Sequence, residues 1–259
     1  MIGILSSGLG GLLFARELAQ HAADAGFLYW GDTAHGPYGS RSVELVGAWV
    51  REGMKFLEKK GAETIVVASG DASVASRFAD PRKLTTQMYP EVNVPVIDYW
   101  DAQIKAALAA TKKKRMGFFG PRLVTERTGM LGLELQGVAV LKKAVAALTP
   151  LILEGEEARG ETRRLVRAHL QWFKTKNIDV LMLGSMHYAR VFDDIKAKMG
   201  KRVTVIHPAQ ALLDLCIAMG LASSSKEGAR QCYLTDITPR DLDIAHAWFG
   251  QPVHAERVV

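Results

Sequence analysis

Two stretches of the chain decide its fold, Thr64-Ile-Val-Val-Ala-Ser69-Gly-Asp71 and Val180-Leu-Met-Leu-Gly-Ser185-Met-His187. Each is an apolar run of strand length that ends on a small residue and a serine, and each leads into a helix-like segment. In open α/β sheets, ligands bind beyond the carboxyl ends of the strands. Two such ends, one in each half of the chain, predict one cleft with two facing walls.

Short buried strands alternate with amphipathic helices along most of the sequence. We expect strands at residues 2–6, 27–30, 65–68, 94–97, 116–119, 180–183, 203–206 and 232–234. Between them, apolar residues at 3–4 spacing predict helices, for example from Val46 to Leu57 and from Leu165 to Phe173. This alternation predicts an α/β fold of parallel-rich sheets flanked by helices on both faces.

Two breaks in the pattern suggest the domain organisation. One lies at residues 89–95 and the other at 207–208, both marked by prolines. We therefore expect a first α/β domain of residues 1–93 plus 208–259 and a second of residues 94–207. The segment 220–228, with three consecutive serines, is expected to be a surface loop.

Composition narrows the class of protein. Hydrophobic residues make up 48% and charged residues 23% of 259 residues, which is typical of a globular protein with a core. No apolar stretch approaches the roughly 20 residues of a membrane span. Because the first strand begins at Ile2, we expect no secretory signal and a cytoplasmic location. The net charge is +6, but no basic stripe with interleaved aromatic residues indicates nucleic-acid binding.

The chain has only two cysteines, Cys216 and Cys232. Both lie in apolar segments, so we expect buried small hydrophobic residues rather than a disulfide. Neither the cysteines nor the histidines have the spacing of a metal site, and no cofactor is expected.

Two glycine-rich loops are candidates for ligand binding. Ser6-Ser7-Gly8-Leu9-Gly10-Gly11 follows the first strand, and its glycine spacing departs from that of dinucleotide-binding loops. Gly31-Asp-Thr-Ala-His-Gly-Pro-Tyr-Gly39 follows the second strand. Free backbone N–H groups and the Tyr38 hydroxyl could hold a small carboxylate there, although a tight structural loop is the competing interpretation.

These loops and the two serine-bearing strand ends occur in the order seen in glutamate racemases, and the chain resembles that family over its whole length. The resemblance implies two domains related by a pseudo-twofold axis with the substrate between them. It also implies a cofactor-free mechanism, in which two thiols on opposite sides of the α-carbon remove and return a proton.

The positions that carry chemistry in the family differ here. The resemblance places the two catalytic cysteines on Ser69 and Ser185, and the helping aspartate on Ser6. The Asn-Thr pair after the first cysteine becomes Gly70-Asp71, and the threonine after the second becomes Met186. The substrate-binding segment reads Gly120-Pro-Arg-Leu-Val124, and an acidic position falls on Leu153, next to Glu154.

The loss of both thiols has a chemical consequence. A cysteine has a pKa near 8.5 that a protein site can lower, whereas a serine hydroxyl is far less acidic. We therefore expect two-thiol racemisation to be absent. The candidate catalytic positions are Ser69, Ser185, Asp71 and His187. The candidate substrate-binding positions are Ser6, Ser7, Tyr38, Gly39, Gly70 and Met186.

Three functions remain open from the sequence. The first is a racemase-fold pseudoenzyme that binds a small carboxylate, an amino acid or a protein partner, with a homodimer left open. The second is a divergent isomerase or lyase that uses Asp71 and His187 as acid and base. A hydrolytic triad of Ser185, His187 and Asp71 is disfavoured because no nucleophile elbow is present. The third is residual glutamate racemisation that supplies D-glutamate for peptidoglycan.

Overall fold

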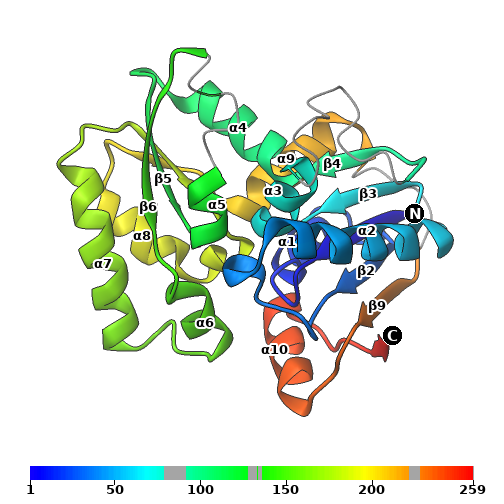
Figure 1. Ribbon diagram of the computed structural model, residues 1–259. Helices are drawn as coiled ribbons and strands as arrows, with labels where there is room; N and C mark the ends of the chain where they lie inside the picture. The colour runs from blue at the N-terminus through cyan, green and yellow to red at the C-terminus, as the bar shows by residue number, and fades with distance from the viewer. Residues whose placement is uncertain (79–91, 128–132, 134–135, 222–227, 259) are drawn as a thin grey trace.

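Two parallel β-sheets carry the fold (Figure 1). The computed structural model describes residues 1–78, 92–127, 133, 136–221 and 228–258. A six-stranded sheet has the order β10-β9-β2-β1-β3-β4, and a four-stranded sheet has the order β6-β5-β7-β8. All strand pairs in both described sheets are parallel. The predicted class, an α/β fold of two domains with parallel sheets, is confirmed.

The first sheet takes strands from both ends of the chain. Its members are β1 (Ile2–Ser6), β2 (Phe27–Gly31), β3 (Thr64–Val67), β4 (Val96–Asp98), β9 (Arg230–Leu234) and β10 (Ala255–Arg257). The helical segments around it are α1 (Leu12–His21), η1 (Tyr38–Ser40), α2 (Val43–Lys59), α3 (Gly70–Phe78), α4 (Tyr99–Ala110), α9 (Pro208–Ala218) and α10 (Pro239–Phe249).

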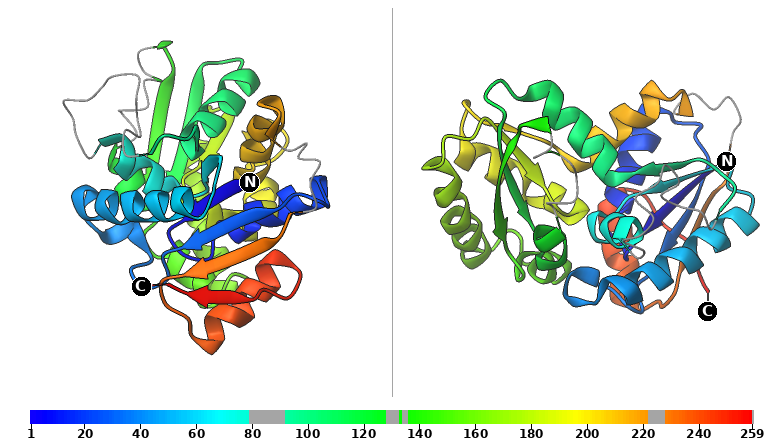
Figure 2. Two further views of the ribbon diagram at one scale, coloured as in Figure 1. Left: turned by 90° about the vertical axis from the view of Figure 1, so that its right-hand side faces the viewer. Right: turned by 45° about the horizontal axis from the view of Figure 1, so that its top comes forward.

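The second sheet is formed by the middle of the chain. Its strands are β5 (Arg115–Gly120), β6 (Ala139–Ala144), β7 (Val180–Leu183) and β8 (Thr204–Val205). The accompanying helical segments are α5 (Arg122–Arg127), α6 (Leu148–Leu153), α7 (Gly160–Lys174), η4 (Met186–Val191) and α8 (Phe192–Met199). Figure 2 shows the two sheets as separate lobes in its right-hand view.

The two sheets repeat one strand order. The run β2-β1-β3-β4 in the first corresponds to β6-β5-β7-β8 in the second. This correspondence aligns β3 with β7, so Ser69 and Ser185 follow equivalent strands. The similarity of the two strand ends in sequence therefore has a counterpart in topology.

Alternate residues of each central strand pack on opposite faces, as the pleat of a strand requires. Ile4 joins the hydrophobic cluster that contains α1, whereas Leu5 joins the cluster that contains α2. The larger cluster continues into the second sheet through residues such as Phe118 and Leu181. One apolar core therefore joins the two walls of the cleft.

All eight expected strands are present; two have the expected bounds, and the ends of the others are shifted by at most two residues. Strands β6 and β10 were missed. β6 is a half-buried edge strand whose apolar start, Ala139-Val-Leu141, continues into two lysines, and β10 has only three residues, two of them charged.

The first expected domain boundary needs correction. β4 pairs with β3 in the first sheet, with Val96 opposite Ile65. The chain therefore leaves the first sheet after Asp98 and not at residue 94. The rest of the division into residues 1–93 plus 208–259 and 94–207 stays a prediction. Most of the expected loop at 220–228 lies outside the described residues. Within the described part of the chain, no helix is long and apolar enough to cross a membrane.

Candidate functional site

The carboxyl ends of β3 and β7 face each other at close range. A Cβ atom added to Gly70 would lie 2.4 Å from the carbonyl oxygen of Gly184, so the two backbones are in direct contact. Two side chains of α4 fix this contact. The Tyr99 hydroxyl donates to the carbonyl of Leu183 at 2.7 Å, and the Trp100 indole donates to that of Gly70 at 3.0 Å. The sequence prediction of two facing strand ends agrees with this geometry.

The first wall carries a short chain of serine hydroxyls. Ser69 donates to the hydroxyl oxygen of Ser7 at 3.0 Å and accepts from the backbone N–H of Ala72 in the first turn of α3. Ser6 accepts from the backbone N–H of Gly11 at 3.0 Å and so stabilises the turn into α1. All three serines are buried, and Ser7 alone of the three lines the cavity that also contains His187. The Ser6 hydroxyl therefore serves as a hydrogen-bond acceptor within the loop.

The second wall pairs a serine with a histidine. The Ser185 hydroxyl lies 3.1 Å from Nδ1 of His187. The imidazole ring packs on the backbone of Gly10 and meets the Trp248 ring edge-on at 5.6 Å. Burial lowers the pKa of His187 to about 4, because the charged imidazolium would lose its hydration. His187 is therefore neutral at pH 7 and is a weak base.

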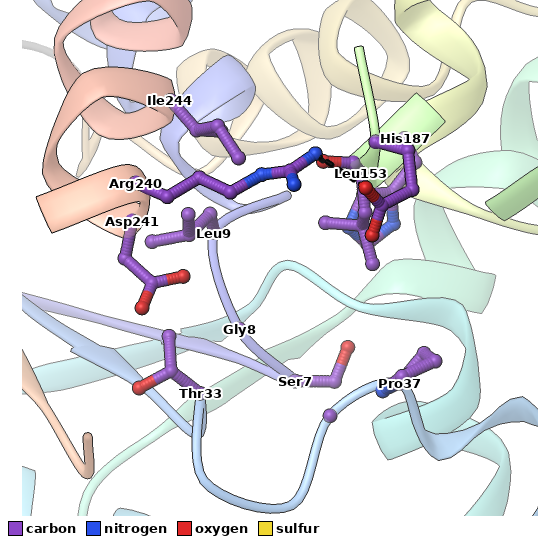
Figure 3. Close-up of a pocket in the computed structure, with 12 residues that line it drawn as sticks. Ser7, Gly8, Leu9, Thr33, Pro37, Leu153, His187, Arg240, Asp241 and Ile244 are labelled. Carbon is purple, nitrogen blue, oxygen red and sulfur yellow. Dashed lines mark hydrogen bonds and ion pairs between the residues drawn. The ribbon is translucent and has the colours of Figure 1, made fainter. Parts of the chain in front are cut away.

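A cavity of about 210 Å³ opens between the lobes (Figure 3). Its residues come from the loops after β1 and β2, from the end of α6, from η4 and from α10. The polar side chains that line it are Ser7, Thr33, Glu154, His187, Arg240 and Asp241. The cavity is smaller than sites for drug-sized ligands, which suits a small metabolite.

Arg240 is the most prominent cation in this cavity and was missed by the sequence analysis. It extends from α10 across the cavity (Figure 3), donates to the carbonyl of Leu153 at 3.3 Å and forms an ion pair with Glu154 at 2.6 Å. Thr238 and Asp241 form a capping box at the start of α10, which is a local signal for a helix start. That signal does not reveal that the helix reaches a cleft built by residues far away in sequence.

The Tyr38 hydroxyl has a partner inside the loop after β2. This phenol is fully buried and donates to Oδ2 of Asp32 at 2.6 Å. Asp32 also accepts from Thr235 at 2.7 Å and lies 2.9 Å from Nδ1 of His35. A phenol has one proton to donate, so in this arrangement Tyr38 organises the loop after β2, and its contact with a ligand carboxylate stays a prediction.

Asp71 and His187 do not line the same cavity. Asp71 lines a second, smaller pocket of about 80 Å³ together with Gly39, and the two pockets share Pro37. Burial raises the pKa of Asp71 to about 7. The structure brings Ser185 and His187 together, and among the described residues Asp71 forms no hydrogen bond to either of them. It therefore does not assemble the triad of Ser185, His187 and Asp71.

Two further expected positions have other surroundings. Met186 is 1% exposed and belongs to the hydrophobic core, and it lines neither of these two pockets. Arg122 lies at the rim of the smaller pocket and is paired with Glu126 at 2.6 Å, with most of its side chain in solvent. Gly70 contributes its backbone to the contact between the walls.

The two cysteines lie away from the cavity. Cys216 is in α9 and Cys232 in β9, both buried and free, as the sequence predicts. Burial raises the pKa of each thiol to about 12. Among the described residues, no group of three His, Cys, Asp or Glu side chains is arranged to hold a metal ion.

Fold and site together define a two-domain α/β protein with a small polar cleft between its domains. No protein-family model matches the chain. A glutamate racemase from Aquifex pyrophilus is 33% identical over 242 residues, which cover 92% of this chain and 89% of that protein. The chain belongs to the glutamate racemase family.

Solved structures agree with this assignment. The crystal structure of glutamate racemase isoform RacE1 from Bacillus anthracis has a TM-score of 0.86 and 26% identity, covering 100% of this chain and 97% of that one. Glutamate racemase from Thermus thermophilus, solved in complex with β-chloro-D-alanine, has a TM-score of 0.80 and 27% identity, covering 99% of this chain and 96% of that one.

Proposed function

We propose that this member of the glutamate racemase family has lost two-thiol racemisation and retains a cleft that binds a small carboxylate or amino acid. One observation carries the proposal. The facing strand ends present the hydroxyls of Ser69 and Ser185, while both thiols of the chain lie elsewhere. We infer that these serines occupy the positions of the family's catalytic cysteines.

The surroundings of the two hydroxyls do not compensate for the missing thiols. Ser69 donates a hydrogen bond to Ser7, and no base contacts Ser69 in the described structure. Ser185 has His187 beside it, but a pKa of about 4 makes this imidazole a poor acceptor of a proton. Abstraction of an α-proton needs a base whose pKa is near the working pH. An acid–base pair of Asp71 and His187 is not favoured either, because the two groups line different pockets.

The cavity at Arg240 supports the binding half of the proposal. A guanidinium can hold a carboxylate through two parallel hydrogen bonds. The Ser7 oxygen accepts a hydrogen bond from Ser69, so the hydroxyl hydrogen of Ser7 can point to a ligand oxygen. Glu154 and Asp241 on the same cavity are suited to an amino group. A relative from Thermus thermophilus has been solved with β-chloro-D-alanine, an amino acid, which is consistent with this ligand class. Free, buried cysteines also suit the reducing cytoplasm.

Loss of racemisation is tested by incubating the protein with L-glutamate and separating the enantiomers on a chiral column. We expect no D-glutamate above the buffer control. Steady formation of D-glutamate that scales with protein concentration would refute this half of the proposal.

Binding is tested by titration calorimetry with glutamate, citrate and tartrate. We expect binding at about millimolar Kd. Arg240→Gln should weaken it by about tenfold or more, because charge-assisted hydrogen bonds are lost. Arg164→Gln is the matched control, since Arg164 forms an exposed ion pair with Glu161 in α7, remote from the cavity. Equal affinities of the two variants would show that Arg240 does not hold the carboxylate.

A further inference from the structure

The smaller pocket contains a buried carboxylate that forms no ion pair with any residue the structure describes. Asp71 is 6% exposed, and its Oδ1 atom has no hydrogen-bond partner. A buried carboxylate of this kind is costly unless a donor or a cation satisfies it. Because the same side chain lines an open pocket of about 80 Å³, a ligand can reach it.

The neighbouring phenols do not satisfy Asp71. The charge of Asp71 contributes to raising the pKa of three nearby tyrosines, Tyr38, Tyr99 and Tyr188. Each donates its proton elsewhere: Tyr38 to Asp32, Tyr99 to the carbonyl of Leu183, and Tyr188 to the carbonyl of Val145. The hydroxyls near the carboxylate therefore already donate their hydrogen bonds to other acceptors.

The shape and lining of the pocket restrict the ligand. Pro37, Pro121 and Pro150 form apolar walls around Asp71, and Gly39 leaves space above the carboxylate. A Cβ atom on Gly39 would lie 3.8 Å from Oδ1 and 3.9 Å from Oδ2 of Asp71. The pocket is well above the roughly 10–15 Å³ that a single water molecule needs. This space fits a charged nitrogen with one or two carbon atoms.

We propose that Asp71 is the anion of a binding site for a primary ammonium group on a short alkyl chain. One or two of the three N–H groups of the ammonium would donate to the carboxylate, and the alkyl carbons would contact the proline rings. The carboxylate repels anions, so the site does not take a second carboxylate. One carboxylate among prolines is also a poor set of ligands for a hard metal cation, which prefers six or more oxygen atoms.

The rim of the pocket is compatible with a cation. Arg122 is the nearest basic residue in the lining, and its charge is balanced by Glu126 at 2.6 Å. The proposal concerns a different pocket from the one at Arg240. It therefore does not depend on whether the chain racemises glutamate or binds a carboxylate.

Titration calorimetry with ethylammonium chloride tests the site, with tetramethylammonium chloride at the same ionic strength as the matched salt. We expect one ethylammonium per chain and at least about tenfold weaker binding of tetramethylammonium, which has no N–H donor. Asp71→Asn should weaken ethylammonium binding by about tenfold or more. Asp243→Asn, an exposed carboxylate on α10, is the control and should leave it unchanged.

Two measurements keep the test decisive if Asp71→Asn fails to fold. Gly39→Ala retains the carboxylate but fills the space beside it, and it should weaken ethylammonium binding. In the wild-type protein, the carboxyl carbon resonance of Asp71 should move toward the ionised position as ethylammonium is added. Equal binding of the two ammonium salts, binding unaffected by Asp71→Asn or Gly39→Ala, or no shift of this resonance would overturn the proposal.

Discussion

The backbones of Gly70 and Gly184 touch across the cleft, with a hypothetical Cβ of Gly70 only 2.4 Å from the Gly184 carbonyl oxygen. Each glycine is adjacent in sequence to one of the two serines, Ser69 and Ser185. The contact thus brings the equivalent ends of β3 and β7 to one place, and it leaves no room for a side chain at Gly70.

The first prediction concerns this contact. Gly70→Ala should destabilise the protein by about 1–3 kcal/mol, because the added methyl group meets rigid backbone. Gly160→Ala is the matched control at the start of α7, where no atom lies within 4 Å of the added carbon. It should be neutral or stabilise by up to about 1 kcal/mol. Urea unfolding measures both, and equal stabilities would show that the walls separate readily.

Restoring the thiols alone should not restore the reaction. In the double variant Ser69→Cys/Ser185→Cys, the second thiol would lie beside a neutral imidazole, which does not lower its pKa as a cation would. Gly70, Asp71 and Met186 would also remain different from the family pattern. We expect glutamate racemisation to stay at background in a chiral assay. Turnover comparable to that of a glutamate racemase measured in parallel would mean that the two thiols suffice.

Asp71 should make stability depend on pH. Its pKa is about 7 in the folded protein and 3.8 in the reference state. The folded state therefore binds the proton more tightly, and stability is lost as pH rises from about 4 through 7. Asp71→Asn removes this loss. Its stability relative to the wild type should improve by about 2–3 kcal/mol between pH 5 and pH 8. A constant difference across this range would show that Asp71 titrates normally.

The titration of His187 should change stability with pH in the opposite direction. Its pKa falls from 6.5 to about 4 on folding. The unfolded chain then binds the proton more tightly, so the stability contributed by the neutral imidazole is present above pH 6.5 and is lost as pH falls toward 4. His187→Gln should reduce the loss in this range by about 3 kcal/mol. Urea unfolding at several pH values measures it, and an unchanged pH dependence in the variant would contradict the burial of this ring.

Local patterns predicted most of the fold, and long-range contacts account for what they missed. Apolar runs identified the strands around Ser69 and Ser185 because buried parallel strands need such runs. β6 was missed because its short apolar start continues into two lysines, as suits a half-buried edge strand. The position of β4 in the first sheet depends on its pairing with β3, which no local signal specifies.

The site was predicted in part for the same reason. Ser7 and His187 lie on the main cavity, as expected of residues at strand ends. The hydrogen bond from Tyr38 to Asp32 and the position of Arg240 in the cavity lining both depend on tertiary contacts. Neither follows from the spacing of residues along the chain.

Exchange of the α-hydrogen in deuterated water tests the central claim most directly, because it detects proton abstraction even without net racemisation. Purified protein is incubated with L-glutamate and, separately, with D-glutamate, and the α-proton signal is followed by nuclear magnetic resonance. A glutamate racemase of the family serves as the positive control. The account predicts that the signal decays no faster than in buffer for either enantiomer. Protein-dependent wash-in of deuterium from either one would contradict the proposed loss of racemase chemistry.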